Sequence, residues 1–242
     1  MGAFFTNVHV CARGLDQRTV RARLIDELRQ WATGQGFREA KPGDDVDRRL
    51  FIGPAGDWIG IFDDECEAQD TNLLEELAST SSRIASAPAI AALIHDSDIL
   101  ELRLAQKGKI VDRYSSWPDY FGPVSARKKR QLAGAPKKWA PVLKSGSSVE
   151  DLGEILGSKT KAAEQVLADV AGLCGIEGNR IFAGSRYLES YVGNPQDAGF
   201  EVLELVLINK PVFEPIDSDQ PPAFSQLAVQ DRLELFVGQP LE

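Results

Sequence analysis

The stretch IAALIHDSDILELRLAQKGKIVDRYSSWPDYFG, residues 90–122, decides the fold. Leucines alternate with charged residues over positions 100–104, which is typical of a strand with one face in water. Turn-forming residues interrupt the apolar segments at 95–98 and again at 106–109. We therefore predict three short strands joined by tight turns. They cover residues 89–94, 99–105 and 110–114.

The segments before this stretch predict a strand, a helix, two strands and a second helix. Val20, Leu24 and Leu28 recur with helical spacing in the first helix, and Asp16 or Thr19 can cap it. These elements are expected at residues 4–12, 19–33, 50–53, 58–63 and 71–86. Together with the strand at 89–94, their order matches the ferredoxin-like (split βαβ) arrangement, extended by the hairpin of residues 99–114.

The second half of the chain predicts a helical layer with an added strand. Helices are expected at residues 149–156, 160–174 and 179–191, and strands at 201–209 and 233–237. Because an exposed sheet face must be covered, we expect an α+β protein in which these helices pack on the sheet. The predicted parts are an α+β sheet lobe at 1–122, a basic connector at 123–147, and a helical lobe with an acidic tail at 148–242.

Composition and charge favour a globular protein and argue against a nucleic-acid binder. The 43% hydrophobic and 26% charged fractions are typical of a globular protein. Residues 1–122 and 190–242 carry net charges of −6 and −7, whereas residues 123–189 carry +4. Acidic ends would repel phosphate, so no nucleic-acid partner is expected.

The sequence also lacks the signals of a membrane or secreted protein. No apolar run approaches the roughly 20 residues of a membrane helix, and residues 1–14 do not resemble a signal peptide. The cysteines Cys11, Cys66 and Cys174 are widely spaced and form no CxxC pair, which favours a reducing, cytoplasmic compartment. Phosphate-binding glycine motifs are missing as well, so no cofactor is expected.

An acidic loop follows the strand at 58–63 and could hold a hard cation. Its spacing does not fit an EF-hand. The favoured interpretation is a solvated loop that supplies negative charge to the start of the next helix, so no metal is expected. The candidate ligands are Asp63, Asp64, Glu65, Glu67 and Asp70.

His95 lies beside Asp96, Ser97 and Asp98, and a histidine next to carboxylates can act as a general base. Neighbours in a tight turn rarely reach catalytic geometry, and aspartates are common in hairpin turns because they bond their own backbone. We therefore favour a turn. His9 is expected to be a packed or edge residue of its strand.

The aromatic exit from the third strand is the strongest candidate site. Aromatic residues next to carboxylates at the rim of a sheet are typical anchors of protein interfaces. The alternative is that these rings turn inward and pin the loop to the core. The predicted protein-binding residues are Asp112, Tyr114, Trp117, Asp119, Tyr120, Phe121, Asp96 and Asp98.

The basic connector allows two interpretations. Seven Lys or Arg residues between Arg127 and Lys144, with Trp139 for stacking, could grip a nucleic acid. The segment could instead pair with the acidic ends of the chain or form a mobile exposed loop. The second interpretation is favoured.

These observations favour a non-enzymatic, acidic, bacterial cytoplasmic protein that binds another protein. A concrete version is an immunity-type protein that masks the active site of a toxin with a basic cleft. The alternative is a small enzyme, or a ligand- or metal-binding protein, with a pocket between the two lobes that uses Asp63, Asp64 and His95. A third possibility is a module that associates through a sheet edge, and the oligomeric state is left open.

Overall fold

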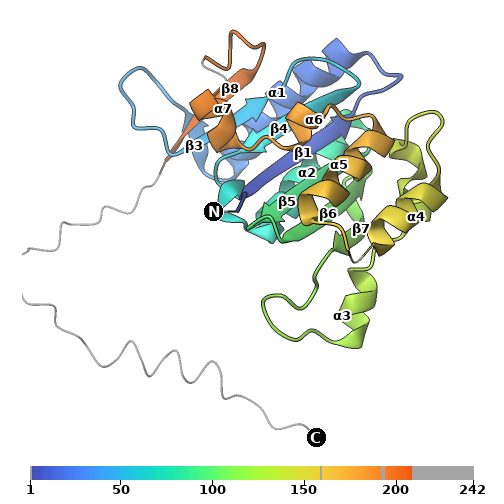
Figure 1. The fold of residues 1–242 in the computed structure, drawn as a ribbon. Coiled ribbons are helices and arrows are strands. Elements are labelled where there is room, and N and C mark those ends of the chain that lie inside the picture. The colour runs from blue at the N-terminus through green and yellow to red at the C-terminus, as the bar shows by residue number, and fades with distance from the viewer. Residues whose placement is uncertain (1, 159, 192–193, 209–242) are drawn as a thin grey trace, which may run out of the picture. The chain divides into compact units, whose positions relative to one another are not determined.

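The computed structural model describes residues 2–158, 160–191 and 194–208. They belong to one compact unit that ends at Ile208. Its centre is one antiparallel sheet in the order β2-β8-β3-β4-β1-β5-β6-β7, with helices packed against it (Figure 1). The α+β class is therefore confirmed. The strands are β1 Phe5–Cys11, β2 Phe37–Glu39, β3 Arg48–Ile52, β4 Trp58–Asp63, β5 Ala89–His95, β6 Ile99–Gln106, β7 Lys109–Ser115 and β8 Glu201–Leu207.

Strand β1 lies at the centre of the sheet and is buried at every position. Val8 is opposite Ile61 of β4 on one side and Ala91 of β5 on the other. Successive side chains of a strand point to opposite faces, so Val8 and Val10 enter one core while Phe5 and Cys11 enter the other. Both faces of the sheet must therefore be covered.

The first face is covered by α1 (Gln17–Gly34) and α2 (Thr71–Ala85). Asp16 caps α1 by accepting hydrogen bonds from the backbone N–H groups of Arg18 and Thr19, so this helix begins two residues before the predicted start. Asp70 caps α2 in the same way. Their buried faces pack on β1, β4 and β5 in a single hydrophobic core.

The second face is covered by the helices that follow residue 148, with α5 lying in front of the sheet in Figure 1. Side chains of the central strands hold this layer in place. Trp58 donates a hydrogen bond to the Cys174 carbonyl at 3.0 Å, and Asn7 donates to the carbonyls of Ile181 and Ala183. The helices are α4 Val149–Gly157, α5 Ala163–Cys174, α6 Gly178–Ile181 and α7 Ser185–Tyr191.

The segment 38–49, which the sequence predicts as a loop, begins in a short strand and ends in another. Strand β8 separates these two strands: Phe37 of β2 is opposite Leu207, and Leu50 of β3 is opposite Leu203. Strand β8 is the added strand predicted at 201–209. The strand predicted at 233–237 lies outside the described residues, and the division into lobes at 122 and 148 stays a prediction.

The basic connector is folded onto the edge of the sheet. It contains the helix α3 (Ala126–Gln131) and the 3-10 helix η2 (Pro136–Val142). Trp139 is completely buried, and its indole donates a hydrogen bond to Asp112 of β7 at 2.8 Å. The expected mobile loop is therefore wrong for this part of the segment, and Trp139 cannot stack on a base.

We predict that Trp139→Ala lowers the free energy of unfolding by about 3–5 kcal/mol, because it opens a large cavity and leaves the buried Asp112 with the Ala135 N–H as its remaining close donor. Chemical denaturation gives the value. Lys137→Ala, which changes an exposed neighbour, is the control and should cost little. A loss below about 1 kcal/mol for Trp139→Ala would show that the connector is not part of the cooperative fold.

Candidate functional site

Two acidic segments that are distant in sequence meet at one end of the sheet. Strand β4 ends at Asp63 and β5 ends at His95, and both run antiparallel to β1. The side chain of Gln69 joins the segments, because it donates a hydrogen bond to the Ile94 carbonyl at 2.9 Å and its amide oxygen contacts Nδ1 of His95. The 3-10 helix η1 (Cys66–Ala68) precedes this glutamine.

Five ring-bearing side chains gather at this end of the sheet and form what we call the aromatic cluster. The ring of His95 meets those of Phe4, Tyr120 and Phe121 edge to face, with centroids 4.9, 5.8 and 5.0 Å apart. Trp117 joins the cluster through Tyr120, at 5.2 Å. Phe121 is 78% exposed, Trp117 52% and Phe4 45%. Contiguous exposed aromatic surface of this kind is typical of interaction sites.

The loop after β7, which carries Trp117, Tyr120 and Phe121 of the aromatic cluster, is anchored by internal and external contacts. The N–H of Tyr120 donates to the Trp117 carbonyl, and Asp119 forms an ion pair of 2.7 Å with Lys129 of α3. The hydrogen bond from Lys129 lowers the pKa of Asp119 below its ordinary value. These contacts anchor the loop, while the side chains of Trp117 and Phe121 stay exposed.

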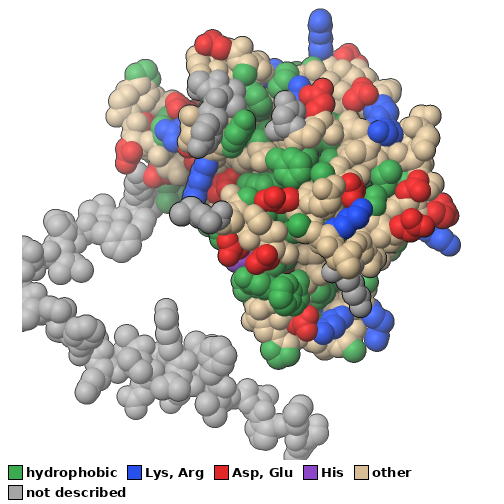
Figure 2. Space-filling model, in the orientation of Figure 1, with side chains coloured by type: hydrophobic (Ala, Val, Ile, Leu, Met, Phe, Trp, Pro, Cys, Tyr) green, Lys and Arg blue, Asp and Glu red, His purple; other side chains and the backbone are tan. Residues whose placement is uncertain are grey.

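Acidic side chains surround the aromatic cluster on the side of the β5–β6 turn. Asp96 and Ser97 both have positive φ, as the tight hairpin turn predicted at 95–98 requires. Ser97 donates a hydrogen bond to Glu164 of α5 at 2.8 Å, and Asp96 and Asp98 are exposed. Acidic and hydrophobic side chains lie next to one another around a histidine at this edge (Figure 2).

The predicted protein-binding residues divide into two groups. Asp112 and Tyr114 are buried, at 7% and 3% exposure, and contribute to the core around Trp139. The other six residues reach the surface at the same end of the molecule. Phe4 and His95 were not predicted for this surface. Because Phe4 precedes Phe5 in a strand, alternation alone requires that the two rings point to opposite sides.

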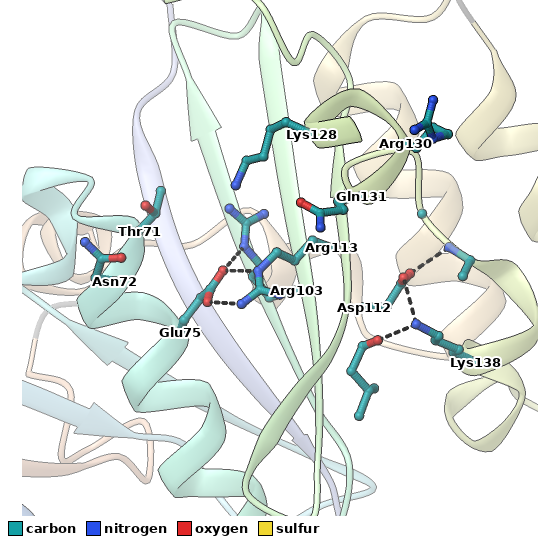
Figure 3. A pocket seen from close by; sticks show the side chains of 13 residues that line it. Thr71, Asn72, Glu75, Arg103, Asp112, Arg113, Lys128, Arg130, Gln131 and Lys138 are labelled. Atoms are coloured by element: carbon teal, nitrogen blue, oxygen red, sulfur yellow. Dashed lines mark hydrogen bonds and ion pairs between the residues drawn. The ribbon is translucent and has the colours of Figure 1, made fainter. Parts of the chain in front are cut away.

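A polar cavity of about 470 Å³ lies beside the aromatic cluster, and we call it the basic cavity (Figure 3). The first turn of α2 supplies one wall, β6 and β7 supply the floor, and α3 supplies the opposite wall. Five cationic and two anionic side chains line it. They are Arg103, Arg113, Lys128, Arg130, Lys138, Glu75 and Asp112.

Glu75 binds two arginines in the basic cavity. Arg113 donates to both carboxylate oxygens, at 2.7 and 2.6 Å, and Nε of Arg103 donates to one of them at 2.6 Å. Burial acts to raise the pKa of Glu75, but the hydrogen bonds from Arg113 and Arg103 hold that pKa below its ordinary value. Bidentate arginine pairing of this kind is strong and geometrically specific.

A second cavity, of about 460 Å³, adjoins the basic cavity and shares Thr71, Arg103 and Lys128 with it. His95 and Phe121 of the aromatic cluster also line it. The two cavities therefore form one continuous depression between α2 and α3.

The acidic loop after β4 is built into the fold. Asp63 is completely buried and forms an ion pair with Arg48 at 2.5 Å, and Glu65 lies 3.2 Å from the same guanidinium. Burial raises the pKa of Asp64 to about 6, and its carboxylate accepts a hydrogen bond from the Arg49 N–H at 2.9 Å.

The remaining two acids of that loop accept hydrogen bonds from backbone N–H groups at the starts of helices. Glu67 is buried and accepts a hydrogen bond from the Ser185 N–H at the start of α7, and Asp70 caps α2. All five candidate metal ligands thus have structural partners, as do the residues of the alternative site. Asp63 contacts Arg48, whereas His95 contacts Gln69 and the aromatic cluster.

The other histidine, His9, is completely buried and lies edge to face with Phe62. Burial, with a smaller effect of Arg180, lowers its pKa from 6.5 to about 3. His9 is therefore a packed residue, as predicted.

Comparisons with known proteins assign no family to the chain. No protein-family model, curated protein or solved structure matches it. Within the described residues, no helix is long and apolar enough to cross a membrane. The same residues contain no group of three or more His, Cys, Asp or Glu side chains that could hold a metal ion.

We expect Asp63→Asn to lower the free energy of unfolding by about 3–5 kcal/mol, because it removes the main negative charge paired with the buried guanidinium of Arg48 and replaces one of the two acceptor oxygens by an NH2 donor. Urea denaturation measures the change. Glu65→Gln removes a charge from the same arginine at a partly exposed position and should cost less than about 1 kcal/mol. Equal losses for the two variants would contradict the structural role of Asp63.

The titration of His9 should destabilise the fold at low pH. The unfolded chain protonates this ring below about pH 6.5, whereas the folded chain does so only near pH 3. His9 therefore makes the free energy of unfolding fall by about 1.4 kcal/mol per pH unit as the pH drops through this window. His9→Gln should show a shallower slope in denaturation measured from pH 7 to pH 4, and an unchanged slope would overturn the assignment.

Proposed function

We propose that this chain is a non-enzymatic protein that binds another protein through the aromatic cluster and the acidic residues beside it. The observation that carries the proposal is the exposure of Phe4, Trp117 and Phe121 in one patch of contacting rings. Aromatic side chains supply most of the binding energy where they are desolvated at the centre of an interface.

The preferred partner carries a basic surface. The chain has a net charge of −9, and Asp96, Asp98 and Asp70 are exposed at the end of the sheet that carries the aromatic cluster. Complementary charge speeds the encounter of two proteins and orients them before the apolar contacts form. A bacterial toxin with a basic substrate cleft fits this description, which makes the chain an immunity-type protein of the cytoplasm.

We also propose that β1, α1, β3, β4, α2 and β5 constitute a ferredoxin-like unit. Two observations support this proposal: these strands occur in the order β3-β4-β1-β5, and both helices pack in one core on the same face. Strands β6 and β7 then extend the sheet on one side, and β8 and β2 extend it on the other.

The alternative, an enzyme or metal-binding protein built on Asp63, Asp64 and His95, has less support. Asp63 is the main partner of the buried Arg48, so its use in chemistry would unpair that guanidinium. The contacts of His95 with aromatic rings favour an anchor in a binding surface instead.

Trp117→Ala and Phe121→Ala should abolish capture of the partner while leaving the melting temperature nearly unchanged, because both rings are exposed. The tagged protein is incubated with a lysate of the organism that encodes it, and a stoichiometric partner is identified and purified. Leu15→Ala, which truncates an apolar side chain that is 44% exposed but outside the cluster, is the control.

Binding of the purified partner then tests the mechanism. Each aromatic variant should weaken affinity by about 2 kcal/mol or more, and Asp96→Asn with Asp98→Asn should slow association and reduce its salt dependence. Retention of full affinity by Trp117→Ala and Phe121→Ala, or binding that is independent of salt, would overturn the proposal. Loss of folding in Trp117→Ala would show that the ring belongs to the core.

A further inference from the structure

The charge of the basic cavity opposes that of the whole chain. Its lining residues carry five positive and two negative charges, in a protein of net charge −9. Glu101, which forms an ion pair with Arg103 at 2.6 Å, reduces the local surplus to two. A surplus of two positive charges inside a concave site matches a dianion.

Several hydrogen-bond donors in the basic cavity are unused. Arg103 is only 7% exposed at its side chain and is occupied by Glu75, Glu101 and two backbone carbonyls. Nη1 of Arg113 and Nζ of Lys128, in contrast, make no ion pair or hydrogen bond with the described residues. These two groups are free to bind an anion.

The free donors converge from two walls. In Figure 3, Lys128 and Gln131 extend from α3 toward the arginines, and Thr71 and Asn72 lie on the opposite side, at the start of α2. The side chains of Thr71, Asn72 and Gln131 make no hydrogen bonds with described residues either. Hydroxyl, amide, ammonium and guanidinium groups arranged around one volume suit the tetrahedral oxygens of a phosphate.

The second cavity offers space for a planar group of the same ligand. It shares Lys128 with the basic cavity, and it is also lined by His95 and Phe121, whose ring centroids lie 5.0 Å apart. A ligand whose charged end lies near Lys128 can therefore place an aromatic ring against these side chains. Each cavity alone is within the size range of small-molecule sites.

We propose that this depression binds a small phosphomonoester that carries a planar aromatic group, with a nucleoside monophosphate as the test case. The phosphate lies between Arg113 and Lys128, and the aromatic group lies against His95 and Phe121. Glu75 keeps Arg113 in place for the phosphate. This ligand site adjoins the exposed protein-binding surface, and the two share His95 and Phe121.

Isothermal titration of the full chain with adenosine 5′-monophosphate, adenosine and inorganic phosphate tests the proposal. The monophosphate should bind saturably, more tightly than either fragment, and more weakly as salt increases. Lys128→Gln should weaken its affinity about tenfold or more, because a charge-assisted hydrogen bond is lost. Lys137→Gln removes the same charge from an exposed neighbour that does not line the cavity, and should leave the affinity unchanged.

Phe121→Ala should weaken binding of the monophosphate but not of inorganic phosphate. Absence of saturable binding by both anions, or equal losses in Lys128→Gln and Lys137→Gln, would overturn the site. If adenosine 5′-monophosphate binds no more tightly than inorganic phosphate, the placement of the aromatic group is overturned. Trp117→Ala should bind the monophosphate normally, and Lys128→Gln should still capture the protein partner, so failure of this proposal is distinguishable from failure of the proposed function.

Discussion

The pairing of β1 between β4 and β5 is the constraint on which the rest of the structure depends. Every residue of Phe5–Cys11 is buried, so this strand exposes no side chain on either face. Burial of a strand on both faces requires two separate layers of cover, and the chain supplies α1 and α2 before residue 86 and the α4–α7 layer after residue 148. Asn7 joins strand and cover directly, through hydrogen bonds to the carbonyls of Ile181 and Ala183.

The helical layers leave part of β6 and β7 uncovered, and the candidate sites lie near these two strands. Arg103 and Arg113 are opposite one another on these strands, and both donate hydrogen bonds to Glu75 of α2. Beyond this contact the connector closes the edge of the sheet, because Trp139 is buried against Asp112. The space that remains between α2 and α3 forms the two cavities, and the loop after β7 carries Trp117, Tyr120 and Phe121 of the aromatic cluster.

The net charge of the chain and the local charge of the basic cavity have opposite signs, so they favour different partners. The net charge of the chain favours basic partners, and the acids at the β5–β6 turn strengthen that preference locally. The basic cavity lies next to this acidic region yet favours an anion, because Lys128 and Arg113 come together there without enough carboxylates to balance them. A small dianion and a basic protein can therefore be recognised by adjacent parts of one surface.

The sequence by itself determined the elements whose signals are local. Asp16 and Asp70 mark helix starts, apolar spacing marks the buried faces of α1 and α2, and turn residues delimit β5, β6 and β7. Six of the eight predicted protein-binding residues also reach the surface, because they lie in a turn and a loop. Only the tertiary structure decided the burial of Asp112 and Tyr114, the strand at Phe37–Glu39 and the convergence of charges around Lys128. The physical reason is that each of these depends on a distant partner: a carboxylate can be buried only when a donor such as Trp139 satisfies it, and a short strand forms only when β8 supplies its hydrogen bonds.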